Sequence, residues 1–224
     1  MIYLTGDTHI PIDISKLNTK HFPQQKEMTK NDYVIVLGDF GLLWQRNKTY
    51  EHWKKWLEGR NFTTLWIDGN HEAHDWIDSL NVSEWHGGRV HKISDSIIHL
   101  MRGQVFEIER KRFFTMGGAT SIDRDYRIEN VSWWAREVPS YWEEQDGIYN
   151  LSRCYNHVDY VLTHTCPHNL ISPIFHIKPI NDPVSKYLDY IWEIVDCKDW
   201  YFGHWHQDID YGRFHCLYNK IIEI

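Results

Sequence analysis

Short apolar runs recur along the chain and are separated by polar or glycine-containing stretches. Short runs rich in β-branched and aromatic residues are typical of strands, particularly where glycine or proline bounds them. The pattern predicts strands at 2–5, 33–37, 63–67, 97–101, 104–108, 112–116, 160–163 and 200–203, with shorter strands near 209, 214–217 and 221–223.

A second pattern, with apolar residues three or four positions apart, predicts helices at 49–57, 73–80, about 140–153 and 183–197. Trp53, Trp56 and Leu57 share one face of the first helix. The third begins with the capping-box pattern Ser140-Tyr-Trp-Glu143. Pro183 stands in the first turn of the fourth, where proline is tolerated.

The order of these elements predicts an α/β protein with two mixed β-sheets and helices outside. From 97 to 116, strands follow one another through tight turns at Arg102-Gly103 and Glu109-Arg110-Lys111, which indicates antiparallel or mixed pairing. The loop from Thr120 to Pro139 is long, and long loops are functional or disordered. We find no internal repeat or linker and expect one domain over 1–224.

Composition is ordinary for a globular protein, with 25% charged and 42% apolar residues, and the formal net charge is −7. The acidic balance argues against strong binding to duplex nucleic acid. The four cysteines form no Cys-x-x-Cys pair. We see no signal peptide, and no run approaches the ~18 apolar residues of a membrane span. We therefore expect a cytoplasmic protein that does not bind membranes.

The candidate chemistry begins at the end of the run Val34 to Leu37, which stops at Gly38-Asp39. Gly38 has no Cβ, so another group can approach the backbone closely. Asp39 then stands at the carboxyl end of a buried strand, where open α/β sheets place their ligands. We predict that Asp39 is shared by two metal ions.

Other polar groups also follow predicted strands: Asp7-x-His9, Gly69-Asn70-His71-Glu72, Thr163-His164 and Gly203-His204-Trp205-His206. Alternate residues of an extended segment point the same way, which pairs Asp7 with His9 and His204 with His206. Carboxylate, amide and imidazole donors suit Mn, Fe or Zn better than Mg or Ca. Seven such groups are too many for one ion. They fill most of the coordination shell of two, with water and substrate taking the rest.

Together these blocks resemble the calcineurin-like metallophosphoesterase family, whose pattern is Asp-x-His, Gly-Asp, Gly-Asn-His-Asp/Glu, a strand-end His and Gly-His-x-His. The match runs from Asp7 to His206, and Gly117 to Ser121 with Trp133-Trp134 resembles small bacterial and phage members. The resemblance implies α/β/β/α layers and assigns the ligands: Asp7, His9 and His206 for one ion, Asn70, His164 and His204 for the other, and Asp39 bridging.

The same resemblance implies hydrolysis of a phosphomonoester or phosphodiester, on a small-molecule or nucleotide substrate, by a hydroxide that bridges the two ions. His71 would assist the leaving group as a proton donor or a positive charge. The expected cofactors are two divalent transition-metal ions, manganese first, with iron or zinc as alternatives.

One departure from the family concerns the segment Asp39 to Leu43, which reads Asp-Phe-Gly-Leu-Leu. The carboxylate and arginine of the protein Ser/Thr phosphatase branch are missing there, which argues against a protein phosphatase. We predict that Arg124 or Arg127, in the long loop, contacts the substrate phosphate. The alternative is that they face solvent or pair with Asp123 and Asp125. Trp133 or Trp134 could stack on a base, although packing is the other role open to them.

Two short motifs resemble other hydrolase families. His204-x-His206-x-Asp208 resembles part of the metallo-β-lactamase-fold block, but Ile209 stands where its last histidine belongs. His74-Asp75 resembles the doublet of HD-domain phosphohydrolases, which are helical. Within the phosphoesterase family, a non-catalytic scaffold is disfavoured by the intact ligand set, and a nuclease for long substrates by the acidic charge. The sequence does not specify the oligomeric state.

Overall fold

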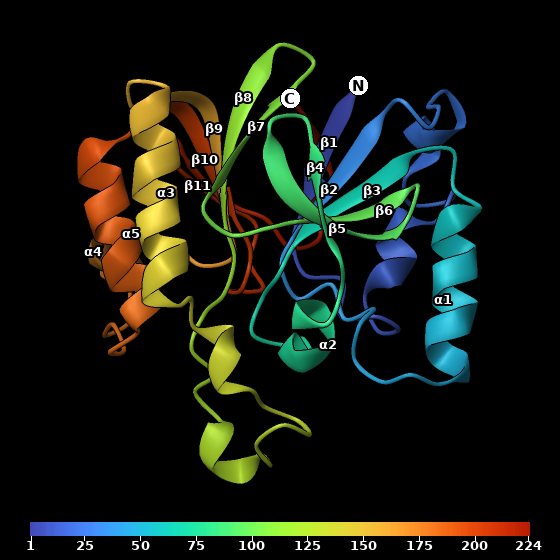
Figure 1. The fold of residues 1–224 in the computed structure, drawn as a ribbon, viewed down its shortest axis with the longest axis horizontal. Helices are drawn as coiled ribbons and strands as arrows, with labels where there is room; N and C mark the ends of the chain where they lie inside the picture. Colours follow the sequence, from blue (N-terminus) through green and yellow to red (C-terminus); the bar gives the residue numbers. More distant parts are fainter.

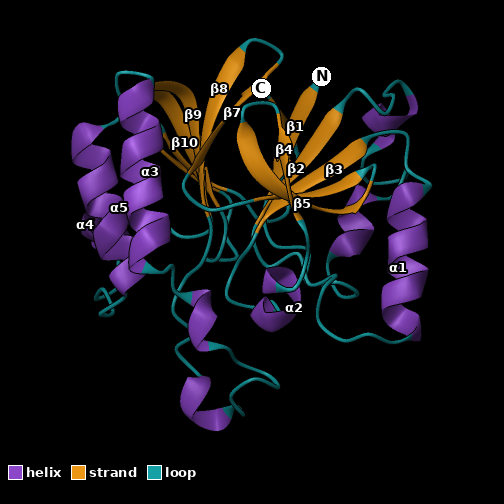
Figure 2. Ribbon diagram, in the orientation of Figure 1, coloured by secondary structure: helices purple, strands orange, loops and turns teal.

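Two β-sheets pack face to face, and helices cover the outer surface of each (Figure 1). The computed structural model describes residues 1–224. Figure 2 shows α3, α4 and α5 on one side of the molecule and α1 on the other. The fold is therefore the predicted helix-flanked two-sheet sandwich with mixed sheets.

The first sheet has seven strands in the order β13-β1-β2-β3-β6-β5-β4. Its strands are β1 (Ile2–Thr5), β2 (Tyr33–Leu37), β3 (Thr63–Ile67), β4 (Val82–Trp85), β5 (Gly88–Ser94), β6 (Ile97–Leu100) and β13 (Ile222–Glu223). The strands β1, β2, β3 and β6 are parallel, whereas β4, β5 and β13 pair antiparallel with their neighbours.

The second sheet has six strands in the order β11-β12-β10-β9-β8-β7. Its strands are β7 (Gln104–Ile108), β8 (Lys111–Met116), β9 (His157–Thr163), β10 (Asp196–Phe202), β11 (Ile209–Tyr211) and β12 (Phe214–Cys216). The strands β8, β9, β10 and β12 are parallel. In both sheets, therefore, the strands that precede candidate ligands run parallel to a neighbour.

The helices are α1 (Lys48–Glu58), α2 (His74–Asp78), α3 (Tyr141–Arg153), α4 (His168–Phe175) and α5 (Pro183–Ile194), with short 3-10 turns η1 (Ile14–Leu17), η2 (Pro23–Lys26), η3 (Arg124–Tyr126) and η4 (Ala135–Glu137). The predicted capping box at Ser140 and Glu143 is present at the start of α3. No helix combines the length and the apolar character needed to cross a membrane.

Successive side chains of a strand face opposite sides of its sheet, so the core consists of three layers. In β2, Ile35 and Leu37 face the second sheet, while Val34 and Val36 pack beneath α1 and the N-terminal 3-10 turns. In β10, Trp200 and Phe202 belong to the layer under α3, α4 and α5. Burial on both faces explains why these strands read as nearly continuous apolar runs.

The long loop projects from the edge of the sandwich at which the parallel strands end (Figure 1). It is ordered around η3, η4 and an isolated bridge between Glu129 and Trp133. Because β1, β2, β3, β9 and β10 all end at this edge, the residues that follow them are gathered from distant parts of the sequence.

Several elements differ from the sequence prediction. The sequence did not predict the strands β4 and β5 or the helix α4. The strand β4 is a half-exposed edge strand with few apolar residues, and α4 contains Pro173, which disfavours a helix prediction. The predicted helix 183–197 ends at Ile194, and Cys197 lies in β10, where pairing with β9 overrides helical spacing. The turn at Arg102-Gly103 joins two different sheets, so β6 and β7 do not pair.

Candidate metal centre

The carboxylate of Asp39 stands between two histidines that come from different sheets. Its Oδ2 lies 3.2 Å from Nε2 of His9, and its Oδ1 lies 3.3 Å from Nε2 of His164. The side chain is buried, with 1% of the residue exposed. Each oxygen of this one carboxylate therefore faces a different set of candidate ligands.

The first set lies beside β1. One candidate ligand atom from each of Asp7, His9, Asp39 and His206 lies within 4.8 Å of the other three. The His9 and His206 rings have centroids 4.9 Å apart, and Nε2 of His206 is 3.9 Å from Oδ1 of Asp7. This arrangement of two carboxylates and two imidazoles can hold one cation.

The second set lies at the ends of β3, β9 and β10. The Oδ1 of Asn70 is 3.1 Å from Nε2 of His164, and the rings of His164 and His204 have centroids 5.0 Å apart. With Asp39 between the two sets, the structure brings together all seven residues that the sequence singles out as ligands.

Side-chain direction at the strand ends does not follow strand alternation. His9, His204 and His206 have positive φ values of 35°, 68° and 49°, so none is extended. His204 turns toward His164 and His206 toward His9. The argument that puts His204 and His206 on one face is therefore wrong, and Asp7 and His9 meet through a turn of the chain.

Two glycines make room for this packing. A Cβ on Gly38, whose φ is 87°, would overlap the imidazole of His164, and a Cβ on Gly69 would overlap the carboxylate of Asp39. The close approach predicted at Gly38 is therefore present. Asp39 itself has a φ of 45°. Residues other than glycine rarely adopt this backbone conformation, and those that do cluster at functional sites.

Hydrogen bonds to the opposite ring nitrogen orient the two histidines. Nδ1 of His9 is 2.9 Å from a carboxylate oxygen of Asp13, and Nδ1 of His164 is 2.8 Å from the carbonyl oxygen of Leu37. When each Nδ1 donates its hydrogen to these acceptors, Nε2 is left as the unprotonated nitrogen that faces Asp39. Such partners orient metal-binding histidines.

The charges at the site also fit a bound cation. Asp7 and Asp39 are both buried, and neither forms an ion pair with a lysine or arginine. Burial raises the pKa of Asp7 to about 6. Burial opposes ionisation of Asp39 as well, but His164 and His9 hold its pKa well below its usual range. Bound cations would compensate this buried negative charge.

Two buried ionisable residues beside the site, Lys16 and Glu72, have contacts that the sequence did not predict, although Glu72 belongs to the block Gly69 to Glu72. Nζ of Lys16 donates to the backbone oxygens of Gly6, Asp7 and Tyr218, so this ammonium ties three segments together without pairing with a carboxylate. Glu72 accepts hydrogen bonds from the backbone N–H groups of Phe40 and Gly41 and holds the turn after Asp39. Both contacts join residues distant in sequence, so no local pattern reveals them.

The two arginines predicted to contact the substrate, Arg124 and Arg127, differ in their exposure and in their contacts. Nη1 of Arg127 lies 3.2 Å from Nδ1 of His71, and its guanidinium forms two hydrogen bonds with Asp123, of 2.7 and 2.8 Å. Arg124 is exposed and forms no ion pair. Trp134 is buried, 4% exposed, with its ring edge against Trp44, which is a packing role.

The family model for calcineurin-like phosphoesterases matches residues 1–208 of the 224. The chain belongs to the calcineurin-like phosphoesterase family. A search of curated proteins found no match. Membership indicates a metal-dependent hydrolase of phosphoesters, and the cluster around Asp39 is its candidate metal site.

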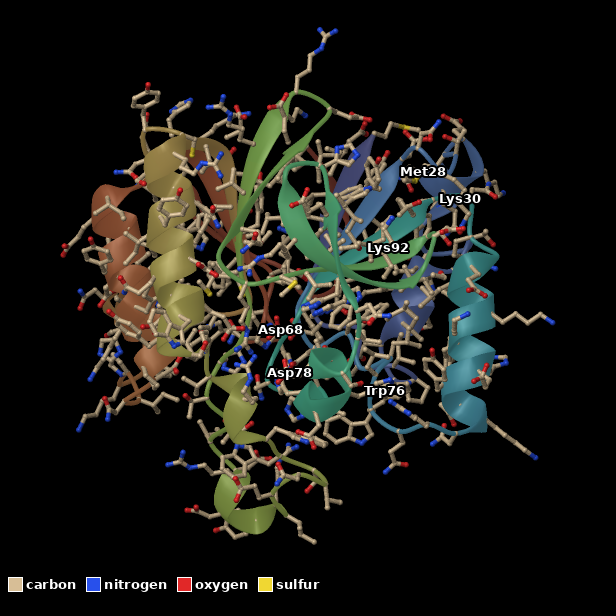
Figure 3. All side chains as sticks on the ribbon, in the orientation of Figure 1. Met28, Lys30, Asp68, Trp76, Asp78 and Lys92 are labelled. Atoms are coloured by element: carbon tan, nitrogen blue, oxygen red, sulfur yellow. The ribbon has the colours of Figure 1, made fainter.

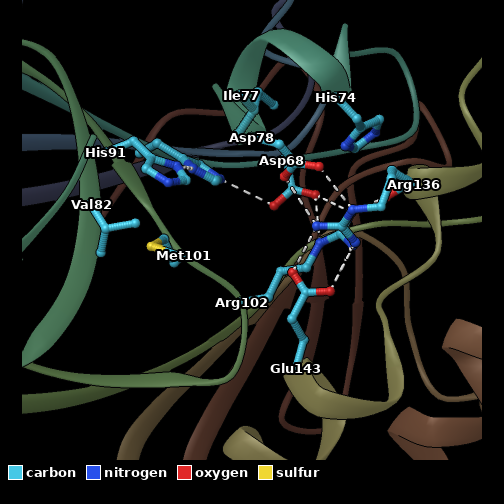
Figure 4. Close-up of a pocket in the computed structure, with 11 residues that line it drawn as sticks. Asp68, His74, Ile77, Asp78, Val82, His91, Met101, Arg102, Arg136 and Glu143 are labelled. Carbon is cyan, nitrogen blue, oxygen red and sulfur yellow. Dashed lines mark hydrogen bonds and ion pairs between the residues drawn. The ribbon is translucent and has the colours of Figure 1, made fainter. Parts of the chain in front are cut away.

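In this calcineurin-like phosphoesterase, a separate polar cavity of about 280 Å³ is lined by Asp68, two residues before Asn70, together with Arg102 and Glu143 (Figure 4). Asp68, the residue after β3, bonds to Arg102 and to Nε2 of His99 there. Figure 3 shows Asp68 and Asp78 near α2, where the cavity lies. The carbonyl of Asp68 also accepts from Gly118. This buried network anchors the turn after β3, because breaking it would leave charges unpaired.

His74 and Asp208, each taken from a motif that resembles another hydrolase family, have structural roles in this phosphoesterase. His74, of the His74-Asp75 doublet, lines the polar cavity rather than the metal centre, and the chain is built on two sheets rather than on helices alone. Asp208 accepts hydrogen bonds from the backbone N–H groups of Tyr218 and Lys220, so it holds the C-terminal turn. Neither His74 nor Asp208 therefore contributes a ligand to the cluster around Asp39.

Proposed function

We propose that this chain hydrolyses a phosphoester with two divalent cations. Asp7, His9 and His206 would hold one cation, Asn70, His164 and His204 the other, and Asp39 would be shared. The observation that carries this proposal is the position of the Asp39 carboxylate, with one oxygen toward His9 and the other toward His164.

The donor atoms suit a transition metal. Imidazole nitrogens combined with carboxylate and amide oxygens favour Mn, Fe or Zn over Mg or Ca, and manganese is the metal we propose first. When bound, two such cations would act as Lewis acids, making the phosphoryl group more electrophilic and the attacking water more acidic.

We propose that His71 stabilises the leaving group. Arg127 has only donors, so its contact with Nδ1 of His71 makes that nitrogen the acceptor and places the ring hydrogen on Nε2. His71 would direct this N–H toward the leaving oxygen and stabilise the charge that develops there. Arg127 would also reach the substrate phosphate; the exposed Arg124 stays a weaker candidate for that contact.

The proposed substrate is a small phosphoester or a nucleotide, processed by a single domain formed by residues 1–224. The net charge of −7 disfavours strong binding of duplex nucleic acid. All four cysteines are unpaired thiols, three of them buried, which supports our proposal of a reducing cytoplasmic location.

The decisive experiment measures metal dependence directly. The purified chain would be stripped with a chelator, reloaded separately with Mn²⁺, Fe²⁺, Zn²⁺ or Mg²⁺, and assayed on bis(para-nitrophenyl) phosphate and para-nitrophenyl phosphate. Calorimetry would count the ions bound per chain. We expect two bound ions and turnover that returns with Mn²⁺. Absence of turnover with every metal and both esters would favour a non-catalytic scaffold.

A further inference from the structure

Two hollows open beside the metal centre, and His71 is the one residue that lines both. The first, about 310 Å³, contains Asp39, Asn70, His204 and His206 and is therefore where the phosphoryl group would lie. The second, about 270 Å³, is lined on its other sides by His9, Ile10, Pro11, Ile12, Gly41 and Trp44.

The only ionisable side chains that line the second hollow are the imidazoles of His9 and His71. No lysine, arginine, aspartate or glutamate lines it, and its apolar lining comes from Ile10, Pro11, Ile12 and Trp44. Ile12 is 75% exposed, so its apolar side chain is accessible to a group bound in the hollow. A charged group placed against Pro11, Ile12 and Trp44 would lose hydration without gaining an ion pair from them, whereas an apolar one would bury surface.

Trp44 forms a rigid wall of this hollow. Its ring packs against the edge of the buried Trp134, with centroids 5.4 Å apart and planes at 78°. Its centroid is 6.4 Å from that of His71. A planar leaving group beside His71 would therefore contact an indole that is already held in place. The indole loses little conformational entropy when such a group binds.

We propose that the hollow walled by Trp44 and Ile12 is the subsite for the leaving alcohol, and that this alcohol carries an uncharged aromatic or aliphatic group. The inference rests on the proposed function, because it places phosphorus over the cations and the leaving oxygen at His71. The hollow is at the small end of ligand pockets, which span ~300–1,000 Å³, so it accommodates about one ring system.

The test compares methyl phosphodiesters that differ only in the leaving group: phenol, 2-naphthol and para-carboxyphenol. Hydrolysis breaks the bond between phosphorus and the aryl oxygen, water supplies the new oxygen on phosphorus, and the phenol departs with a proton. The Mn²⁺-loaded parent should prefer the phenyl and naphthyl esters to the charged one. Two further methyl diesters, one releasing a nucleoside and one releasing butanol, would be compared in the same assay. The one hydrolysed with the higher kcat/KM would identify the natural occupant as a nucleobase or as an aliphatic chain.

Two variants address the subsite. Trp44→Ala should lower kcat/KM for the naphthyl ester by roughly 10-fold or more, in the range of a lost apolar contact, and change the carboxyphenyl ester little. Ile12→Ser should act in the same direction, and this exposed position can change without disturbing the core. Competitive inhibition by 2-naphthol should weaken in both. Trp142→Ala, at an exposed position on α3 that lines neither hollow, is the matched control.

The outcomes separate the two proposals. If the parent hydrolyses all three esters equally well and both variants behave like the control, the leaving-group subsite is overturned while the phosphoesterase function stands. If no diester is hydrolysed with any metal, the proposed function fails and the subsite fails with it.

Discussion

Asn70 donates a hydrogen bond from Nδ2 to the Oγ of Ser121, at 3.1 Å. The hydroxyl of Ser121 in turn donates to Glu137 at 2.6 Å, and its backbone N–H donates to the same carboxylate at 2.7 Å. Because the hydroxyl hydrogen is used by Glu137, only its lone pairs face Asn70. The amide of Asn70 is thereby oriented with Oδ1 toward His164, where a cation would bind.

This relationship predicts the effect of Ser121→Ala. Loss of the acceptor frees the Asn70 amide to rotate, and we expect the cation held by Asn70, His164 and His204 to bind roughly 10- to 100-fold less tightly, as is typical when a metal ligand loses its orienting partner. Calorimetric titration with Mn²⁺ measures this. Ser152→Ala, on the exposed side of α3, is the control. Unchanged affinity at both sites would show that Ser121 does not orient Asn70.

Asp39→Asn tests the shared ligand. The substitution keeps the shape of the side chain but removes the negative charge between His9 and His164, so we expect at most one ion to bind and turnover to fall to background. Metal content after desalting and kcat/KM are the measurements. Asp95→Asn, in the exposed turn between β5 and β6, should retain parent values. Parent-like hydrolysis by Asp39→Asn would refute the bridging role.

Arg127→Ala tests the contact with His71. We expect kcat to fall by roughly 10²-fold, by analogy with loss of one group that stabilises developing charge, because His71 loses the donor that orients its ring. The variant Arg124→Ala should have a smaller effect, since that side chain is exposed. Arg110→Ala, in the turn between β7 and β8, is the control for loss of surface charge. Equal kinetics for all three variants and the parent would count against any role of Arg127.

The polar cavity predicts sensitivity to acid. Burial lowers the pKa of His74 from 6.5 to about 3, and the facing Arg102 and Arg136 act in the same direction, whereas Asp68 and Asp78 oppose it. The folded state therefore keeps His74 neutral while the unfolded chain binds a proton below pH 6.5. This contribution to stability is complete above pH 6.5 and decreases as the pH falls toward 3.

His74→Phe removes this titration. Between pH 6.5 and 4, the free energy of unfolding of the parent should fall more steeply than that of the variant, by up to about 1.4 kcal/mol per pH unit for one proton. Urea unfolding at several pH values measures the slopes. The difference between the two proteins near neutral pH gives the packing effect alone. Parallel slopes would show that His74 does not couple folding to pH.

The sequence by itself determined the strands that precede the candidate ligands and the identity of those ligands. Apolar runs such as Val34 to Leu37 predict strands locally, and β2 and β3 run parallel in one sheet, so Asp39 and Asn70 follow them at a common edge. His164 follows a strand of the second sheet and joins them only because the two sheets pack face to face. Close approach at Gly38 followed from the missing Cβ, and His164 indeed occupies that space.

Only the tertiary structure decided how these residues face one another. His204 and His206 diverge because each has a left-handed backbone, which strand alternation cannot anticipate. The link from Asn70 to Ser121 and the hollow at Trp44 depend on segments brought together from distant parts of the chain. Side-chain direction at a turn and contacts across sheets are set by global packing, and a local pattern carries no record of either.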